Sequence, residues 1–365
     1  MRLIVSIQLD CGRAGQEKFI YYIRNTLERK ETPMINLKHK QWLDQTIRRI
    51  KPSIILICII LAGISNTATG SSSGYTACAT YWGTSHYIEY IAGDLPIIIS
   101  APHGGYLEPS EITKRTCGDQ VETDERTQEL TREVSTYIQQ ETGKCPHIVI
   151  NKLHRSRLDA NRDIGEAACG SSISEQSWRE YHAFIDAAKA TVTTQYGKGL
   201  YLDFHSNIDY DGRWVELGFL LYSTDLTKSD TALNASQYKN RSSVKSLAYT
   251  PGVYFPEIIR GWTSLGGLLQ RQGYKAVPSP AYPDSTSSSE QYLNGGYNTA
   301  RHGSRSGGTI DGVQVESFTK FLRDDARPAY GRALAESILT FVETYYGSRD
   351  KFVYLPLVAQ RTSSP

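Results

Sequence analysis

The stretch Leu95-Pro-Ile-Ile-Ile-Ser-Ala-Pro-His-Gly-Gly105 joins a β-branched apolar run to a histidine and two glycines. Its apolar part predicts a buried strand, which we expect to form a β-hairpin with residues 86–91 across Gly93-Asp94. Paired glycines let the backbone turn tightly and approach a ligand closely. We therefore expect His103 at the carboxyl end of this strand, pointing into a crevice.

Strands and helices alternate along the rest of the chain. Apolar periodicity predicts six further elements: a helix from Thr123 or Asp124 to Gly143, a strand over 147–151, a helix from Ser174, strands over 200–204 and 215–222, and a last helix from Pro328. This order predicts an α/β fold of three layers, α/β/α, around a mostly parallel, mixed central sheet. We expect residues 71–365 to form this single domain.

Composition excludes several classes of protein. Of the 365 residues, 21% are charged and 39% are hydrophobic, which argues against wholesale disorder and against a polytopic membrane protein. Lys and Arg number 40 and Asp and Glu number 38, so the net charge is +2. Residues 1–52 carry a net charge of +6, which leaves −4 for the remainder. The globular part therefore offers no basic stripe, and we expect no nucleic-acid partner.

Residues 1–70 combine a basic segment with the apolar run Ile54–Ala62. The run is short for a membrane span, which needs about 20 apolar residues, but it suits the core of a secretory signal. Small residues at 67–70 suit cleavage, and Met34 would serve as a start in the usual place before such a signal. A buried element of a small N-terminal domain is the alternative. We expect a secreted mature chain that begins near Ser71 and has no stable membrane span.

Cysteine usage fits that compartment. Two of the six cysteines lie in the segment expected to be removed, which leaves Cys78, Cys117, Cys145 and Cys169. An even number in a secreted chain predicts two disulfides, with three possible pairings. The chain lacks a C-x-x-C motif after residue 71, which argues against a thiolate zinc site.

Three motifs lie at or near the carboxyl ends of predicted strands, where active sites of open α/β sheets lie. Besides His103, the motif Asp203-Phe-His-Ser206 places His205 at a strand end, and Glu316 lies on the strand 312–317. Two histidines and one carboxylate would make a three-ligand zinc site, with Glu316 as the general base beside it. The alternative is a pair of hydrogen-bonded structural histidines.

The third ligand stays open at this point. Glu108, Asp124 and Glu125 are the carboxylates within reach in sequence. Glu108 is followed by a proline, which favours a loop carboxylate in solvent. Asp124 at a predicted helix start would either bind the metal or cap the helix, and capping is the commoner role.

Six separated motifs now point to one family, and they follow one another in its order: Pro102-His-Gly-Gly105, Thr123-Asp124, Arg155-Ser-Arg-Leu-Asp-Ala-Asn-Arg162, Asp203-Phe-His-Ser206, Gly295–Gly303 and Val313-Gln-Val-Glu316. Over residues 86–345 the chain resembles the N-formylglutamate amidohydrolases. These are zinc-dependent hydrolases with a phosphorylase/hydrolase-like fold, related to zinc carboxypeptidases and cell-wall amidases. The resemblance implies that His103, Asp124 and His205 hold one zinc ion and that Glu316 is the base. Glu125 is the alternative to Asp124 as the third ligand.

The motif 155–162 has a physical argument of its own. Two guanidiniums, a carboxylate and an amide can hold an anionic substrate while satisfying their own charges. We expect Arg162 to face a substrate carboxylate or the oxyanion, and Arg155 to brace the loop through Asp159. The residues expected to bind substrate are Arg155, Asn161, Tyr297 and Arg301, the last two on a glycine-flexible loop over the crevice. Ala300 departs from the family pattern, in which the arginine follows the threonine directly.

The sequence thus predicts a secreted zinc hydrolase of a linear amide bond. Its substrate would be a small anionic N-acyl (N-formyl) amino acid or a small peptide. The family reaction is an intracellular step, which fits secretion poorly, so the reaction class is retained and the substrate stays open. The alternatives are a carboxypeptidase-like or cell-wall peptide hydrolase and a non-catalytic ligand-binding homologue. The oligomeric state is not predicted.

Overall fold

A computed structural model describes residues 74–118, 120–207, 214–285 and 292–347. These residues belong to one compact unit, which begins at Gly70. The predicted secretory segment, residues 1–70, and the expected start near Ser71 lie outside the described residues. Among the helices that the structure describes, none combines the length and the hydrophobicity needed to cross a membrane.

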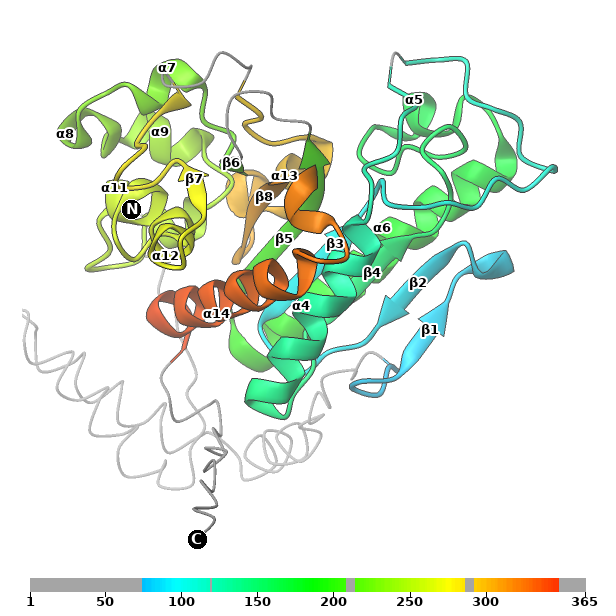
Figure 1. Ribbon diagram of the computed structural model, residues 1–365, viewed down its shortest axis with the longest axis horizontal. Helices are drawn as coiled ribbons and strands as arrows, with labels where there is room; N and C mark the ends of the chain where they lie inside the picture. Colours follow the sequence, from blue (N-terminus) through cyan, green and yellow to red (C-terminus); the bar gives the residue numbers. More distant parts are fainter. Residues whose placement is uncertain (1–73, 119, 208–213, 286–291, 348–365) are drawn as a thin grey trace, which may run out of the picture. The chain divides into compact units, whose positions relative to one another are not determined.

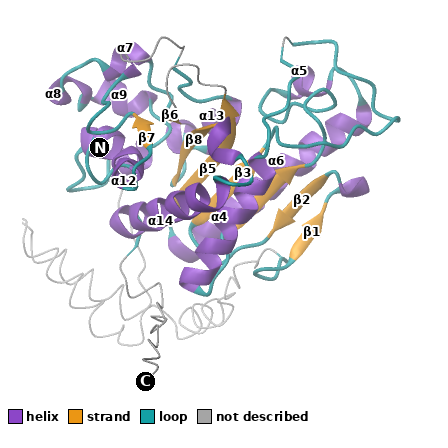
Figure 2. Cartoon of the chain, viewed as in Figure 1, coloured by secondary structure: helices purple, strands orange, loops and turns teal. Residues whose placement is uncertain are grey.

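An eight-stranded mixed sheet forms the centre of the fold, in the order β1-β2-β4-β3-β5-β8-β6-β7 (Figures 1 and 2). The strands are β1 (Thr80–Trp82), β2 (Ile88–Ile91), β3 (Ile97–Ala101), β4 (His147–Asn151), β5 (Gly199–Asn207), β6 (Trp214–Gly218), β7 (Lys275–Val277) and β8 (Ile310–Phe318). Pairing is parallel for β3–β4, β3–β5, β5–β8 and β6–β7, and antiparallel for β1–β2, β2–β4 and β6–β8. The predicted mostly parallel, mixed sheet is confirmed.

Helices cover both faces of this sheet, which confirms the three-layer prediction. They are α4 (Thr127–Thr142), α5 (Ile164–Ala168), α6 (Ser172–Tyr196), α7 (Ser223–Leu226), α8 (Asp230–Leu233), α9 (Ser236–Arg241), α10 (Lys245–Ala248), α11 (Phe255–Arg260), α12 (Leu265–Arg271), α13 (Tyr297–His302) and α14 (Arg327–Tyr345), with 3-10 turns at Thr84–His86, Ser304–Ser306 and Thr319–Leu322. Helices α4 and α14 pack together on one face, and α6 packs on the other (Figure 1).

The central strand β5 shows how the sequence separates core from site. Leu200, Leu202 and Phe204 join the core cluster of α4 and α14. Tyr201 joins the cluster of α6 on the opposite face. Successive side chains of a strand alternate between faces, so Asp203 and His205 lie on the same face as Tyr201. One face of β5 is therefore apolar from Leu200 to Phe204, whereas the other becomes polar and ionisable toward its carboxyl end.

The predicted hairpin between residues 86–91 and the strand 95–100 is wrong. Strand β2 pairs with β1 and β4, and β4 lies between β2 and β3 in the sheet. The connection is bonded to the start of β4 instead, since Asp94 N donates to Cys145 O at 2.9 Å and Asp94 Oδ1 accepts from Cys145 N at 2.8 Å. A side chain at Gly93 would meet the backbone of His147 at 2.4 Å. Gly93 therefore allows two chain segments to pass each other in close contact.

Two further element boundaries differ from prediction. Helix α4 begins at Thr127 and not at 123–124, because Arg126 has a left-handed backbone with φ of 59°. The strand expected over 215–222 ends at Gly218, and Leu220 has a φ of 59°. Asp124 consequently lies in the segment before α4, where it is not a helix cap.

Asp311, near the start of β8, is buried with 1% of its surface exposed. Its carboxyl group accepts hydrogen bonds from Ser304 Oγ, Leu247 N at 3.2 Å and Tyr346 OH at 3.0 Å. Burial raises the pKa of Asp311 to about 6, against the lowering effect of these donors. An acid whose folded pKa lies above its unfolded value stabilises the fold below the unfolded pKa, near 4. That contribution is lost as the pH rises through 6.

Asp311→Asn is expected to raise the free energy of unfolding at pH 8 by about 3 kcal/mol, since about two pKa units separate the folded and unfolded states. Near pH 4 the variant and the wild type should be equally stable, because the wild-type group is then protonated. Chemical unfolding at the two pH values measures the difference. The same stability difference at both would show that the ionisation of Asp311 is not its cause.

Candidate metal centre

The three ligands expected from sequence come together from three separate elements. His103 follows β3, Asp124 lies before α4, and His205 is near the carboxyl end of β5. One ligand atom of each residue lies within 4.8 Å of the other two. Both histidines are buried, whereas the Asp124 side chain is 10% exposed. Because β3 and β5 are parallel, their carboxyl ends meet at this edge of the sheet.

The backbone around His103 explains how Asp124 reaches the cluster. Asp124 N donates to His103 O at 3.2 Å, and Thr123 Oγ1 donates to the same carbonyl. Gly104 makes this approach possible, since a Cβ there would come within 2.3 Å of Thr127 Oγ1. The Pro-His-Gly-Gly motif thus lets the segment before α4 lie directly against the residues after β3.

Each histidine directs one ring nitrogen toward Asp124. The distances from Asp124 Oδ2 are 3.4 Å to His103 Nδ1 and 2.9 Å to His205 Nδ1. The opposite nitrogen of each ring contacts another carboxylate: Asp159 Oδ1 at 2.6 Å for His103 Nε2, and Asp203 Oδ2 at 2.9 Å for His205 Nε2. A carboxylate behind a histidine fixes the tautomer and orients the other nitrogen toward a metal.

The sequence patterns did not predict these orienting contacts of Asp159 and Asp203. For Asp203 a signal existed, because a residue two positions before His205 on a strand shares its face. Asp203 is fully buried and also accepts hydrogen bonds from Ser100 Oγ at 2.6 Å and Tyr201 OH at 3.0 Å. For Asp159 the sequence offered only its pairing with Arg155.

The cluster holds three carboxylates whose pKa values are lowered. Burial raises the pKa of Asp124, but His103 and His205 outweigh it and hold the pKa below the usual range. The pKa values of Asp159 and Asp203 are lowered in the same way, against burial, by their histidines. Burial lowers the pKa of His205, yet Asp203 and Glu316 hold that pKa well above its usual value. The position between the rings therefore favours positive charge.

Glu316 lies beside this cluster as expected. Strands β5 and β8 are parallel, and the register pairs His205 with Glu316. Glu316 is 5% exposed, and its Oε1 accepts a hydrogen bond from Gln314 Nε2 at 2.7 Å. Burial raises the pKa of Glu316 to about 7, against the lowering effect of His205. Its carboxyl group is thus adjacent to the candidate ligands and suited to proton transfer near neutral pH.

Arg155 and Asn161 also lie at this centre. Arg155 Nε donates to Asp159 Oδ2 at 2.8 Å, which confirms the predicted bracing pair, and its Nη1 is 3.6 Å from Asp124 Oδ1. Asn161 N donates to Asp159 Oδ1 at 3.0 Å. One guanidinium therefore lies against both carboxylates that contact His103.

Arg162, Tyr297 and Arg301 contact residues outside the candidate ligand cluster. Arg162 pairs with Glu166 at 2.9 Å, and its side chain is 31% exposed. The segment expected to be a glycine-flexible loop forms helix α13 instead, so that prediction is wrong. On this helix Arg301 is 3.7 Å from Asp186 of α6, and Tyr297 packs near Trp178, with ring centroids 6.3 Å apart. The substrate roles of Arg162, Tyr297 and Arg301 stay predictions.

Of the carboxylates that the sequence left open, Asp124 is the one in the cluster. Glu108 pairs with Arg157 at 3.2 Å and is 42% exposed. Glu125 is exposed. The geometry thus separates Asp124 from both alternatives.

Comparisons with known proteins give distant structural likenesses. No protein-family model matches the sequence, and no curated protein sequence matches it. A similar solved structure is the N-formylglutamate amidohydrolase from Ralstonia eutropha JMP134, with 13% identity, 71% of this chain and 97% of that chain covered, and a TM-score of 0.44. A bacteriophage poly-gamma-glutamate hydrolase has 14% identity, 70% and 89% coverage, and a TM-score of 0.34. A metallo-carboxypeptidase from Burkholderia cenocepacia has 9% identity, 76% and 67% coverage, and a TM-score of 0.33.

Proposed function

We propose that the protein is a zinc-dependent hydrolase of a linear amide bond in an N-acyl (N-formyl) amino acid or a small peptide. One observation carries the proposal: the Nδ1 atoms of His103 and His205 face Asp124 while a second carboxylate contacts each ring from behind. Glu316 stands next to His205 in the register. A structural pair of histidines would not need this convergence of ligand atoms beside a buried carboxyl group.

The donor set fits one zinc ion. Two imidazole nitrogens and one carboxylate oxygen match the protein ligands of catalytic zinc sites, which keep a fourth position open. The orienting carboxylates, Asp159 and Asp203, complete the arrangement. An ion held by these residues would supply Lewis-acid polarisation of a carbonyl group and activation of water.

Glu316 is the proposed general base. It accepts a proton from the attacking water as the carbon–oxygen bond forms, and it delivers that proton to the amine as the carbon–nitrogen bond breaks. Burial beside His205 supports this role, because the carboxyl group is held close to the reacting position and its pKa is raised to about 7. The charge of the tetrahedral intermediate requires a nearby cation, for which Arg162 is the first candidate.

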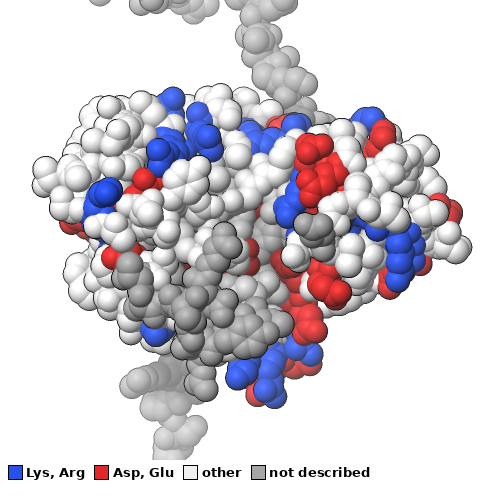
Figure 3. Space-filling model, turned by 90° about the horizontal axis from the view of Figure 1, so that it is seen from above, with Lys and Arg blue, Asp and Glu red and all other residues white. Residues whose placement is uncertain are grey.

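Recognition of an anionic substrate is assigned to Arg155, Asn161, Arg162, Tyr297 and Arg301. Arg162 keeps part of its side chain exposed next to the turn that carries Asn161. On the face seen in Figure 3, Lys and Arg side chains lie among Asp and Glu side chains.

Secretion is part of the proposal. The described cysteines form two disulfides, Cys78–Cys145 and Cys117–Cys169, as the sequence predicted without choosing the pairing. Disulfides persist mainly in oxidising compartments outside the cytosol. This supports an extracellular enzyme whose substrate is met there.

The test combines metal analysis with a substrate panel on the purified full chain. We expect one zinc ion per chain, and turnover of at least one class among N-formyl amino acids, N-acetyl amino acids, carboxypeptidase substrates and cell-wall peptides. Chelation should abolish turnover, and added zinc should restore it. One bound zinc without turnover on any class would favour a ligand-binding protein. A chain without bound zinc would exclude the proposed chemistry.

A further inference from the structure

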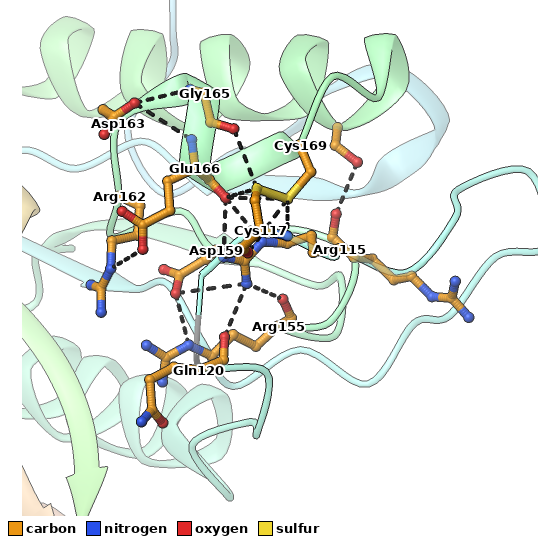
Figure 4. The surroundings of a disulfide bond; sticks show 12 residues. Arg115, Cys117, Gln120, Arg155, Asp159, Arg162, Asp163, Gly165, Glu166 and Cys169 are labelled. Carbon is orange, nitrogen blue, oxygen red and sulfur yellow. Dashed lines mark hydrogen bonds and ion pairs between the residues drawn. A yellow bond between two sulfur atoms is a disulfide. The ribbon is translucent and has the colours of Figure 1, made fainter.

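A disulfide lies close to the proposed metal centre and joins two of its parts (Figure 4). Cys117 belongs to the segment that leads to Asp124, and Cys169 ends helix α5. Helix α5 directly follows the turn that carries Asp159 and Asn161. The disulfide therefore connects the segment of the third proposed ligand with the segment of the carboxylate that orients His103.

Arg115 ties the same two segments together inside the fold (Figure 4). Its side chain is 1% exposed, and its Nη1 donates to Arg155 O at 3.0 Å and Gln120 O at 3.1 Å. Its Nε and Nη2 donate to Glu166 O at 3.2 and 3.0 Å. A planar guanidinium can hold several carbonyls in a fixed arrangement, which an ammonium group cannot reproduce.

The segment from Arg115 to Asp124 has few other anchors. Arg115 itself is buried, but every described residue from 116 to 126 is at least partly exposed. Close to Asp124, the anchors are the hydrogen bonds of the backbone and Thr123 to the residues after β3, together with the contacts of the Asp124 carboxylate with both histidines, Arg155 and Ser206 N. A stretch without buried apolar contacts opens locally at low free energy unless bonds hold it. The disulfide and Arg115 supply such bonds at Cys117 and Gln120.

We propose that the Cys117–Cys169 disulfide and Arg115 are positioning elements of the metal centre, holding Asp124 and Asp159 in place for ion binding. This inference rests on the proposed function, because it presupposes a metal at His103, Asp124 and His205. Its consequence is that losing this disulfide weakens metal binding beyond any general loss of stability.

The other disulfide provides a matched control. Cys78–Cys145 closes a sequence separation of 67 residues, against 52 for Cys117–Cys169, so the loop-closure entropies are nearly equal. Cys145 lies just before β4, at the amino end of a strand that runs parallel to β3. The control bridge is therefore at the opposite end of the sheet from His103.

The experiment measures the zinc dissociation constant of the full chain by competition with a chromophoric chelator, below the melting temperature of every variant. The double variant Cys117→Ser/Cys169→Ser should bind zinc about 10- to 100-fold more weakly, the range for lost outer partners of metal ligands. The zinc dissociation constant of Cys78→Ser/Cys145→Ser should stay within about twofold of the wild-type value. Both double variants should lower the melting temperature of the metal-free chain. An equal loss of zinc affinity in both double variants, or no loss in Cys117→Ser/Cys169→Ser, would overturn the inference.

Arg115 provides a second route if the first double variant does not fold. Arg115→Lys keeps the charge but loses the planar array of donors, so it should also weaken zinc binding at least about tenfold. Unchanged zinc affinity in this variant would likewise overturn the inference. Failure of the wild-type chain to bind zinc would overturn the proposed function itself, which distinguishes the two failures.

Discussion

His205→Ala is expected to remove bound zinc and amide hydrolysis together. The substitution deletes the Nδ1 atom that faces Asp124 at 2.9 Å, one of the three proposed donors. Zinc affinity should fall by more than about 10- to 100-fold, which is the loss expected when a residue that hydrogen-bonds a metal ligand is removed. His103→Ala should behave in the same way, because its Nδ1 completes the cluster. Metal content by mass spectrometry and turnover in the substrate panel measure both effects.

The control for this experiment is His86→Ala. His86 is exposed and stacks on Trp82, with ring centroids 5.0 Å apart, outside the proposed ligand set. This variant should keep one zinc ion and wild-type turnover. If either His103→Ala or His205→Ala retains full zinc, the ligand assignment is wrong.

Glu316→Gln should lower kcat by about 10²- to 10⁴-fold while zinc stays bound, because a general base acts mainly in the transition state. The glutamine keeps the shape of the side chain, and its oxygen can still accept from Gln314 Nε2. It cannot accept a proton from water. Initial rates over a range of substrate concentrations separate kcat from KM, and metal analysis on the same sample tests zinc retention.

Glu89→Gln serves as the matched control for a buried glutamate on the same sheet. Glu89 is 4% exposed on β2 and pairs with Arg132 at 2.6 Å. Its substitution should reduce thermal stability and leave kcat unchanged. If Glu316→Gln loses zinc, then Glu316 is a ligand and Asp124 is not. If it turns over normally, the base lies elsewhere, with Glu108 the first carboxylate to test.

Much of the site was predictable because its signals are local. A β-branched run that ends in Pro-His-Gly-Gly places His103 at a strand end, and the alternation along β5 places Asp203 and His205 on one face. Glu316 was located by the same period of two on β8. These features depend on residues only a few positions apart in the chain, so they can be predicted from the sequence.

Other features depend on residues that are distant in sequence. The hairpin prediction failed because β4 inserts between β2 and β3, and no property of Gly93-Asp94 encodes that insertion. The disulfide pairing was one of three possibilities until the segments of Cys117 and Cys169 were seen together. The Gly295–Gly303 segment forms a helix although glycines flank it.

Periodicity and strand-end motifs were enough to predict the α/β layers and to nominate His103, His205 and Glu316, because strand alternation and turn chemistry are short-range properties. Asp124 was chosen among three carboxylates only through the family resemblance. The contact between Asp159 and His103 joins residues 56 positions apart. It exists because the parallel strands β3 and β4 bring the turns that follow them to one edge of the sheet. Packing across those turns places Asp159 against His103, and the spacing along the chain does not encode this contact.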